Sequence, residues 1–319
     1  MSIYKNIDIK EIEKAKKRIK EKILRTPLVK LNYPEKNCEI FLKLESLQSI
    51  GSFKIRGAAN KILKMNSSEL ENGVWTCSAG NMAQAVAWMA RELKIDCTTI
   101  VPNTAPQTKL DSIERLGAHY LKVSFEEFEE IFATREKKGI KGTMIHPFSD
   151  LDVIAGNGTI GLEILEDLND VDSIIVPYAG GGLICGIGLA IKSLKPKTII
   201  YSSEVSTGAP YAASKAKNQP VEVEYEPSFV DGISGSKVFP EMFNLAQKVV
   251  DKTIVSSLKN IEYAIKITAE RNNIIAEGAA GSAIAAAIFD KSLTGKVVCI
   301  LSGGNINSMK LSEILSKNL

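Results

Sequence analysis

Residues 173–183 read Ser-Ile-Ile-Val-Pro-Tyr-Ala-Gly-Gly-Gly-Leu and continue into an apolar segment at 184–194. An apolar run that ends in consecutive glycines before a helical pattern is typical of a buried strand, a turn and a helix. Consecutive glycines let backbone N–H groups converge on an anion, and the helix dipole adds attraction. We expect Gly180, Gly181 and Gly182 to bind a phosphate, with a closely packed turn as the alternative.

The same order of a short apolar run and a longer segment of helical period recurs along the chain. Residues 74–77 precede a helical pattern over 82–93, and residues 97–101 precede one over 106–116. This alternation predicts an α/β protein with doubly wound parallel sheets, whose sites lie at the carboxyl ends of the strands. Further strands are predicted at 119–123, 173–176, 198–202 and 296–301.

The chain has 319 residues, which favours two domains or one large α/β domain. Asn72-Gly73 and His146-Pro147 are turn-like and mark the crossing points between two lobes. We therefore predict a large discontinuous domain, 1–72 and 149–319, and a small inserted α/β domain, 73–148.

Composition narrows the class of partner. The 40 Lys and Arg residues nearly balance the 37 Asp and Glu residues, so we expect a small-molecule partner and neither nucleic acid nor a membrane surface.

Five scattered cysteines without a C-x-x-C pair argue against disulfides and zinc. Residues 1–20 lack the apolar core of a signal peptide, so the cytoplasm is expected. Residues 173–191 are uncharged, but Pro177 and the glycines fit a strand and helix better than a membrane span.

Histidine usage excludes many hydrolase and metal mechanisms. The chain has only His119 and His146, and neither G-x-S-x-G nor H-E-x-x-H occurs in it. The chemistry therefore depends on another group, and no metal is predicted.

A lysine stands where a helix is predicted to begin. Residues 51–57 read Gly-Ser-Phe-Lys-Ile-Arg-Gly, which predicts a turn, an N-cap at Ser52 and a helix that starts near Lys54. The helix dipole opposes a cation in the first turn by roughly 0.3–1 kcal/mol, and partial burial also favours the neutral amine. A neutral amine is what Schiff-base chemistry requires, although a solvated lysine is the alternative.

Two further segments can carry chemistry. Residues 78–84 read Ser-Ala-Gly-Asn-Met-Ala-Gln, in which Asn81 and Gln84 form either a capping box or part of an anion site at a helix start. The apolar run at 296–301 delivers Ser302 to the carboxyl edge of the sheet, where a hydroxyl can bond a heteroaromatic nitrogen or simply begin a turn.

The segment 156–161 formally matches the dinucleotide fingerprint G-x-G-x-x-G. No good strand precedes it, and no suitably placed acidic residue follows, so a nicotinamide-dependent oxidoreductase is kept only as an alternative.

Taken in this order, these segments resemble the fold type II pyridoxal-phosphate enzymes (tryptophan synthase β-like), in the branch of threonine dehydratases and serine racemases. The resemblance spans most of the chain. It also includes Arg25-Thr26-Pro27-Leu28, Lys43-Leu44-Glu45, Ala105-Pro106 with Lys109, His146-Pro147-Phe148, residues 155–159, Asp231-Gly232 and residues 302–305.

The resemblance implies two domains with pyridoxal 5'-phosphate between them, and it assigns roles to named residues. Lys54 would form the Schiff base, Phe53 would flank the ring, and Asn81 would contact the phenolic oxygen. Ser302 would bond the pyridine nitrogen, and Glu277 would lie near the ring. The phosphate would be held by the main-chain N–H groups of Gly180, Gly181, Gly182 and Leu183. The substrate would be bound by Ser78, Asn81 and Met82.

The implied activity is β-elimination from a β-hydroxy amino acid such as L-threonine or L-serine, which gives a 2-oxo acid and ammonia. Lys54 would remove the Cα proton, and a homodimer is expected. A β-replacement enzyme, a serine racemase-like enzyme and a non-catalytic cofactor carrier remain alternatives. Related racemases carry a second serine where this chain has Ala79, so elimination is expected to exceed racemisation.

The chain departs from the family pattern at several positions. Met82 stands where a histidine is usual, Ala179 replaces the first of four glycines, and Asn157 replaces a glutamine. Residues 277–280 read Glu-Gly-Ala-Ala in place of Glu-Pro-Ala-Gly, and residues 204–210 lack the second carboxylate of a racemase-type metal site.

Overall fold

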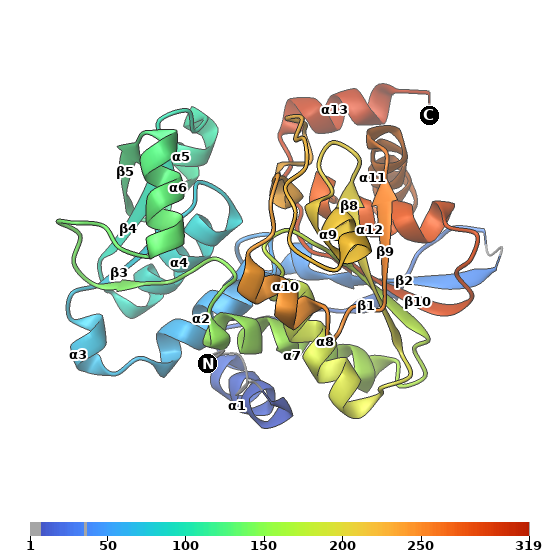
Figure 1. Ribbon diagram of the computed structural model, residues 1–319, viewed down its shortest axis with the longest axis horizontal. Coiled ribbons are helices and arrows are strands. Elements are labelled where there is room, and N and C mark those ends of the chain that lie inside the picture. Colours follow the sequence, from blue (N-terminus) through green and yellow to red (C-terminus); the bar gives the residue numbers. More distant parts are fainter. Residues whose placement is uncertain (1–7, 35–36, 319) are drawn as a thin grey trace.

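The computed structural model describes residues 8–34 and 37–318 and contains two separate sheets (Figure 1). The larger sheet has the strand order β1-β2-β10-β7-β8-β9. Its neighbouring strands are parallel except for the antiparallel pair β1–β2. Its strands are β1 (Leu28–Lys30), β2 (Cys38–Leu44), β7 (Ser173–Pro177), β8 (Ile199–Val205), β9 (Lys252–Ser256) and β10 (Gly295–Leu301).

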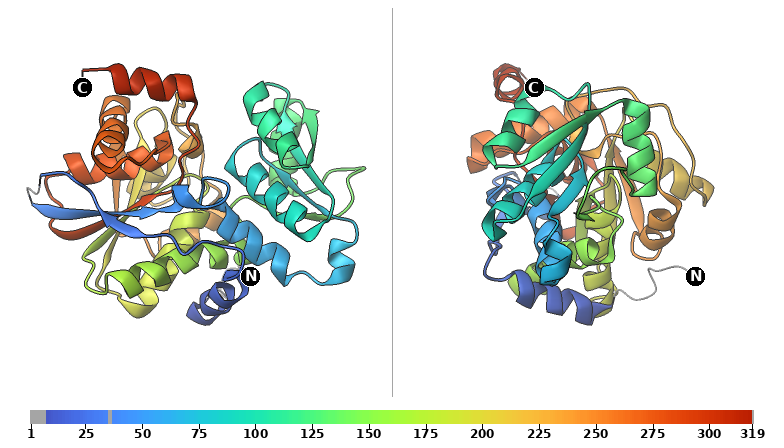
Figure 2. Two further views of the ribbon diagram at one scale, coloured as in Figure 1. Left: turned by 180° about the vertical axis from the view of Figure 1, so that it is seen from behind. Right: turned by 90° about the vertical axis from the view of Figure 1, so that its left-hand side faces the viewer.

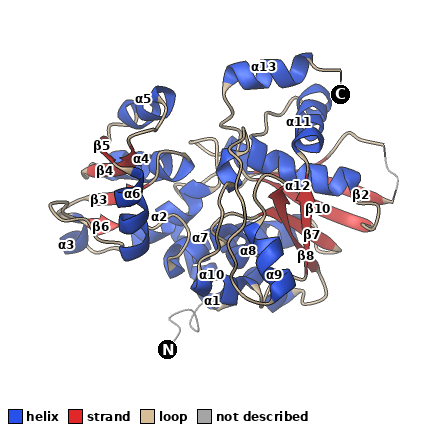
Figure 3. Cartoon of the chain, turned by 45° about the horizontal axis from the view of Figure 1, so that its top comes forward, coloured by secondary structure: helices blue, strands red, loops and turns tan. Residues whose placement is uncertain are grey.

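Alternation of side chains along the central strands builds an apolar core on each face of the larger sheet. In β7, Ile174 and Val176 join one core while Ile175 joins the other. In β10, Val298 and Ile300 face the first core and Val297 faces the second, as the period of two in a strand requires. Helices therefore cover both faces, as a doubly wound sheet demands (Figure 3).

The smaller sheet is wholly parallel and has the order β5-β4-β3-β6 (Figure 3). It belongs to a lobe that lies beside the larger sheet (Figure 2). Its strands are β3 (Val74–Cys77), β4 (Cys97–Pro102), β5 (His119–Val123) and β6 (Thr143–Met144), and its helices are α4 (Asn81–Leu93), α5 (Gln107–Arg115) and α6 (Phe125–Thr134). All of these lie within 73–148, whereas the strands of the larger sheet lie outside that range. The exact domain boundaries stay a prediction.

The other helices surround the larger sheet or bridge toward the smaller one. They are α1 (Ile9–Ile19), α2 (Lys54–Lys64), α3 (Ser67–Leu70), α7 (Leu151–Asp167), α8 (Gly182–Leu194), α9 (Pro210–Lys217), α10 (Pro240–Ala246), α11 (Leu258–Asn272), α12 (Gly278–Phe289) and α13 (Ser308–Ser316). Short 3₁₀ segments occur at Glu45–Leu47 and Asp231–Ile233.

The glycine pattern at 156–161 lies inside α7 and not in a turn after a strand. These glycines allow close helix packing, because a Cβ on Gly156 would collide with the Arg56 carbonyl of α2. A Cβ on Gly158 would lie 2.9 Å from the Gly186 carbonyl oxygen of α8. The dinucleotide-turn interpretation is therefore wrong, and with it the oxidoreductase alternative loses its only motif.

A buried ion network fixes the start of α2. The Arg56 guanidinium lies 2.8 Å from a Glu45 oxygen and 2.7 Å from a Glu163 oxygen, and Lys43 lies 2.7 Å from the other Glu163 oxygen. All four side chains are almost fully buried. The network joins α2 to the end of β2 and to α7, and Arg56 stands two residues after Lys54.

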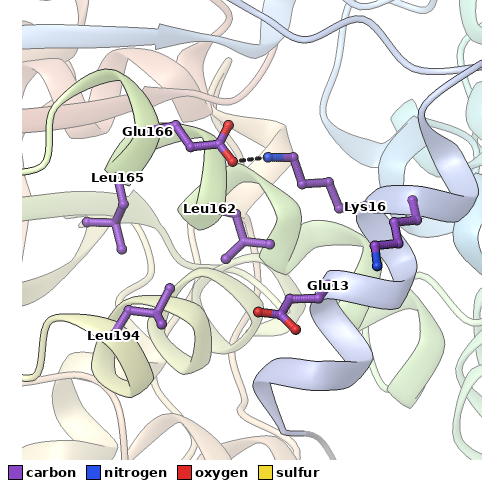
Figure 4. Close-up of a pocket in the computed structure, with 7 residues that line it drawn as sticks. Glu13, Lys16, Leu162, Leu165, Glu166 and Leu194 are labelled. Atoms are coloured by element: carbon purple, nitrogen blue, oxygen red, sulfur yellow. Dashed lines mark hydrogen bonds and ion pairs between the residues drawn. The ribbon is translucent and has the colours of Figure 1, made fainter.

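A surface groove lies between α1, α7 and α8 (Figure 4). It is lined by Leu162, Leu165 and Leu194 and by the charged Glu13, Lys16 and Glu166, and a Lys16–Glu166 ion pair crosses it. None of the predicted site residues lines this groove.

No helix in the described part of the chain is long and apolar enough to cross a membrane. The uncharged stretch at 173–191 is strand β7, a turn and most of α8. Residues 1–7 of the segment analysed for a signal peptide lie outside the described residues.

Candidate functional site

Lys54 is the first residue of α2, which begins beside the carboxyl end of strand β10 of the larger sheet. The Lys54 Nζ donates to the Pro147 carbonyl oxygen at 2.9 Å and lies 5.2 Å from the centre of the Phe53 ring. Burial lowers the pKa of Lys54 to about 8, and the opposing attraction of the Glu277 carboxylate is weaker. About one Lys54 amine in ten is therefore neutral at pH 7.

The backbone around Lys54 is tied to the end of β10. The Phe53 N–H donates to the Ser302 carbonyl at 3.0 Å, and the Gly304 N–H donates to the Gly51 carbonyl at 2.9 Å. The predicted N-cap at Ser52 is wrong by one residue, because Phe53 holds the N-cap position. The Ser52 hydroxyl nevertheless accepts the Lys54 N–H at 3.4 Å. These contacts bring Lys54 and Ser302, which are far apart in sequence, to one place.

Ser302 follows β10 directly and is buried, with an exposed fraction of 2%. Its hydroxyl oxygen has no hydrogen-bond partner among the described residues. Buried hydroxyls are normally paired, so an unpaired one at a strand end marks a position prepared for a ligand atom. A hydroxyl can pair there with a ring nitrogen without giving up its proton.

The glycine turn at 180–182 is built so that side chains do not fit. Gly181 has a φ of +85° and is the N-cap of α8. A Cβ on Gly180 would overlap the Phe148 ring, and one on Gly182 would lie 2.8 Å from the Phe148 carbonyl oxygen. The first N–H groups of α8, including that of Leu183, have no acceptor within the helix, so the turn can hold an anion.

Asn81 begins α4 but does not cap it. The N-cap is Gly80, which has no side-chain cap, so the capping-box interpretation is wrong. The Asn81 amide instead donates to both Glu277 oxygens, at 3.1 and 3.2 Å, and its oxygen accepts from Asn305 at 2.8 Å. Asn81 therefore connects the smaller sheet to residues that flank α12 and β10. Burial raises the pKa of Glu277 to about 7, because the Asn81 bond offsets only part of the desolvation.

The remaining predicted residues lie around this turn. The Ser78 hydroxyl accepts the Gly80 N–H at 3.1 Å, and a Cβ on Gly80 would meet nothing within 4 Å, so the turn faces open space. Met82 is buried within the apolar cluster around α4. Its predicted substrate contact stays a prediction.

Two contacts of the site were not expected from the sequence. The Pro147 carbonyl is an acceptor for Lys54, and Asn305 holds Asn81. Both residues lie in segments that the family resemblance included, which was the only available signal, because a backbone carbonyl has no side-chain signature.

A family model described as pyridoxal-phosphate dependent enzyme matches residues 19–303. The chain belongs to this family. It is 38% identical to an L-threonine ammonia-lyase of Thermotoga maritima over 98% of this chain and 79% of the relative. It is 37% identical to a catabolic L-threonine dehydratase of Staphylococcus aureus over 98% of this chain and 93% of that relative.

Solved structures agree with this assignment. Maize serine racemase superposes with a TM-score of 0.87 at 30% identity and covers 96% of both chains. Processed threonine deaminase isoform 2 of Solanum lycopersicum superposes with a TM-score of 0.85 at 30% identity. The superposition covers 98% of this chain and 95% of the tomato chain. The matches confirm the predicted fold type II class, the pyridoxal-phosphate cofactor and the ammonia-lyase class of enzyme.

The residues at the site fit pyridoxal 5'-phosphate on three independent observations. Lys54 has a lowered pKa, which suits a covalent link to the aldehyde. The unpaired Ser302 hydroxyl suits a ring nitrogen, and the first N–H groups of α8, which have no acceptor within the helix, suit a phosphate.

Proposed function

We propose that this family member catalyses β-elimination from a small β-hydroxy L-amino acid, with L-threonine and L-serine as the first candidates, to give a 2-oxo acid and ammonia. The observation that supports the proposal most directly is the Lys54 amine, with a pKa of about 8, at a helix start whose backbone is bonded to Ser302, the residue with the unpaired hydroxyl. Relatives named as L-threonine ammonia-lyase and dehydratase support the choice of substrate.

In this proposal the cofactor, when bound, withdraws electrons from the bonds at the substrate Cα. The Lys54 amine then takes the Cα proton as a general base, because it is neutral often enough at working pH. The hydroxyl at the substrate β-carbon departs as water, with the proton that Lys54 took from Cα. Water re-enters when the product is hydrolysed, so that the net products are one 2-oxo acid and one ammonia.

The other site residues bind and orient. Ser302 bonds the ring nitrogen, the N–H groups of residues 180–183 hold the phosphate, and Phe53 packs beside the ring. Asn81 contacts the phenolic oxygen and, with Ser78, binds the substrate carboxylate. We propose that Glu277 fixes the Asn81 amide through the two hydrogen bonds described above.

The test is to incubate the purified holoprotein with L-threonine, L-serine and their D-isomers. We expect 2-oxo acid and ammonia in equal amounts from an L-isomer, and a loss of at least about 10²–10⁴-fold in Lys54→Ala, the range attributed to a positioned general base. A chain that forms no 2-oxo acid, but makes a new β-substituted amino acid when a thiol is added, would instead be a β-replacement enzyme.

We further propose that the protein acts in the cytoplasm as a homodimer with an inserted domain at 73–148. The five cysteines are free thiols, which fits a reducing compartment. Light scattering that gives a mass near 34.7 kDa rather than twice that value would reject the dimer. Cell fractionation tests the compartment.

A further inference from the structure

Tyr178 lies between strand β7 and the glycine turn, and its hydroxyl is buried without a partner. Its N–H donates to the Ser203 carbonyl at 2.9 Å, which fixes the backbone against β8. The side chain is 1% exposed. No described residue forms a hydrogen bond with the hydroxyl oxygen. A neutral hydroxyl buried in this way is normally paired, so its position requires an explanation.

The hydroxyl reaches the centre of the glycine turn. A Cβ built on Gly181 would lie 3.1 Å from the Tyr178 hydroxyl oxygen, so the end of the phenol ring contacts the middle residue of the turn. Gly181 is also the N-cap of α8. The unpaired hydroxyl therefore lies next to Gly181, the residue that precedes the first N–H groups of α8.

The ring of Tyr178 is held in place before any ligand binds. It stacks on Tyr211 with ring centres 4.1 Å apart and planes 16° apart. Tyr211 is itself anchored, because the Glu204 carboxylate accepts the N–H groups of Tyr211 and Ala212 at 2.9 and 2.7 Å. A donor with so little freedom loses little entropy when it forms a hydrogen bond. Burial raises the pKa of Tyr178 well above its usual value, so the hydroxyl keeps its proton.

We propose that the Tyr178 hydroxyl donates a hydrogen bond to the phosphate of the cofactor, as a side-chain donor in addition to the main-chain N–H groups of residues 180–183. The inference rests on the family cofactor and on the glycine turn as its phosphate site. The added donor makes the site selective for pyridoxal 5'-phosphate, a phosphate monoester, over pyridoxal, the free alcohol. A hydrogen bond to a charged phosphate oxygen is stronger than one to a neutral hydroxyl.

The Tyr178–Tyr211 stack supplies a matched pair of variants. Tyr178→Phe and Tyr211→Phe each remove one buried unpaired hydroxyl from the same stack, and the Tyr178 hydroxyl is the one that a Cβ on Gly181 would meet first. Cofactor-free protein is titrated with pyridoxal 5'-phosphate and, separately, with pyridoxal, and binding is followed by fluorescence. We expect Tyr178→Phe to weaken pyridoxal 5'-phosphate by about 10-fold or more, as for loss of a hydrogen bond to a charged group. Pyridoxal affinity should stay within about 2-fold, and Tyr211→Phe should change neither affinity.

Thermal unfolding separates this role from a merely structural one. Without cofactor, Tyr178→Phe should unfold at the same temperature as the wild type or higher, because it removes an unpaired buried hydroxyl. With saturating pyridoxal 5'-phosphate, Tyr178→Phe should instead unfold at a lower temperature than the wild type. The proposal is overturned if Tyr178→Phe binds pyridoxal 5'-phosphate within about 2-fold of wild type, if it loses pyridoxal affinity equally, or if Tyr211→Phe has the same effect. A separate variant tests whether the glycine turn is the phosphate site at all. If it is not, Gly181→Asp would leave pyridoxal 5'-phosphate affinity unchanged, which none of the outcomes above requires.

Discussion

We predict that Lys54 captures the cofactor with a pH midpoint near 8 and not near that of an ordinary lysine. Burial lowers its pKa from 10.5 to about 8, while the Glu277 carboxylate opposes the shift. At pH 7 a pKa of about 8 leaves about one amine in ten neutral, against about one in 3,000 for a solvated lysine. The structure therefore makes the Lys54 amine about 300-fold more available at neutral pH.

The assay mixes cofactor-free protein with pyridoxal 5'-phosphate, reduces the adduct with borohydride after a fixed short time, and maps the labelled peptide. The labelling rate of Lys54 should rise about tenfold per pH unit below the midpoint and level off above it. Lys14 is an internal control, because its pairing with Glu11 raises its pKa and its labelling should still rise where that of Lys54 has levelled.

Glu277→Gln tests the sign of the electrostatic contribution. The carboxylate favours the protonated amine, so its removal should move the Lys54 midpoint to lower pH. Because the pKa of Glu277 is raised to about 7 by burial, the variant should differ from wild type mainly above pH 7. A wild-type midpoint near 10, a labelled lysine other than Lys54, or an upward shift in Glu277→Gln would each refute this reasoning.

Three other substitutions have defined outcomes. Gly180→Ala places a Cβ within the Phe148 ring, an overpacking worth about 1–3 kcal/mol, so the cofactor dissociation constant should rise about 10-fold or more by titration; unchanged affinity would contradict the packing argument. Arg56→Met leaves the buried Glu45 carboxylate without its ion-pair partner and should lower the free energy of unfolding, measured by urea denaturation, by about 3–5 kcal/mol, whereas a loss below about 1 kcal/mol would show the network to be unimportant. Ala79 has no proton to donate, so L-serine should be eliminated much faster than it is racemised. Ala79→Ser should raise the racemisation-to-elimination ratio measured by chiral chromatography and a 2-oxo acid assay, and an unmoved ratio would reject this role of Ala79.

The sequence predicted several strands closely. β3 and β5 have the predicted bounds, and β7 extends the prediction by one residue. β3 and β7 are buried along their whole length, whereas only the last residue of β5 is buried. β1 and β6 were missed because strands of three and two residues carry no period. β2 was missed because Lys43 interrupts its apolar pattern, and only the structure shows that Lys43 is buried and paired with Glu163.

Site residues could be predicted where their role depends on one local segment of sequence. They could not be predicted where their role depends on a contact between two distant segments. The position of Lys54 at a helix start follows from local sequence. The role of Asn81 does not, because a capping box and an interdomain contact use the same residue type. Its partners Glu277 and Asn305 are about 200 residues away, so local pattern could not choose between them.

The unpaired hydroxyls connect cofactor binding to the stability of the fold. A buried hydroxyl without a partner costs about 1–3 kcal/mol, and proteins keep few of them. Ser302 lies at the end of β10 and Tyr178 at the end of β7, which are adjacent strands of the larger sheet. Because parallel strands place their carboxyl ends at one edge, a single ligand with a ring nitrogen at one end and a phosphate at the other can satisfy both groups. Cofactor binding then removes the free-energy cost of two buried unpaired hydroxyls. The folded chain carries this cost without the cofactor, and the unfolded chain does not. The cofactor must therefore stabilise the protein by more than its direct contacts with Lys54 supply.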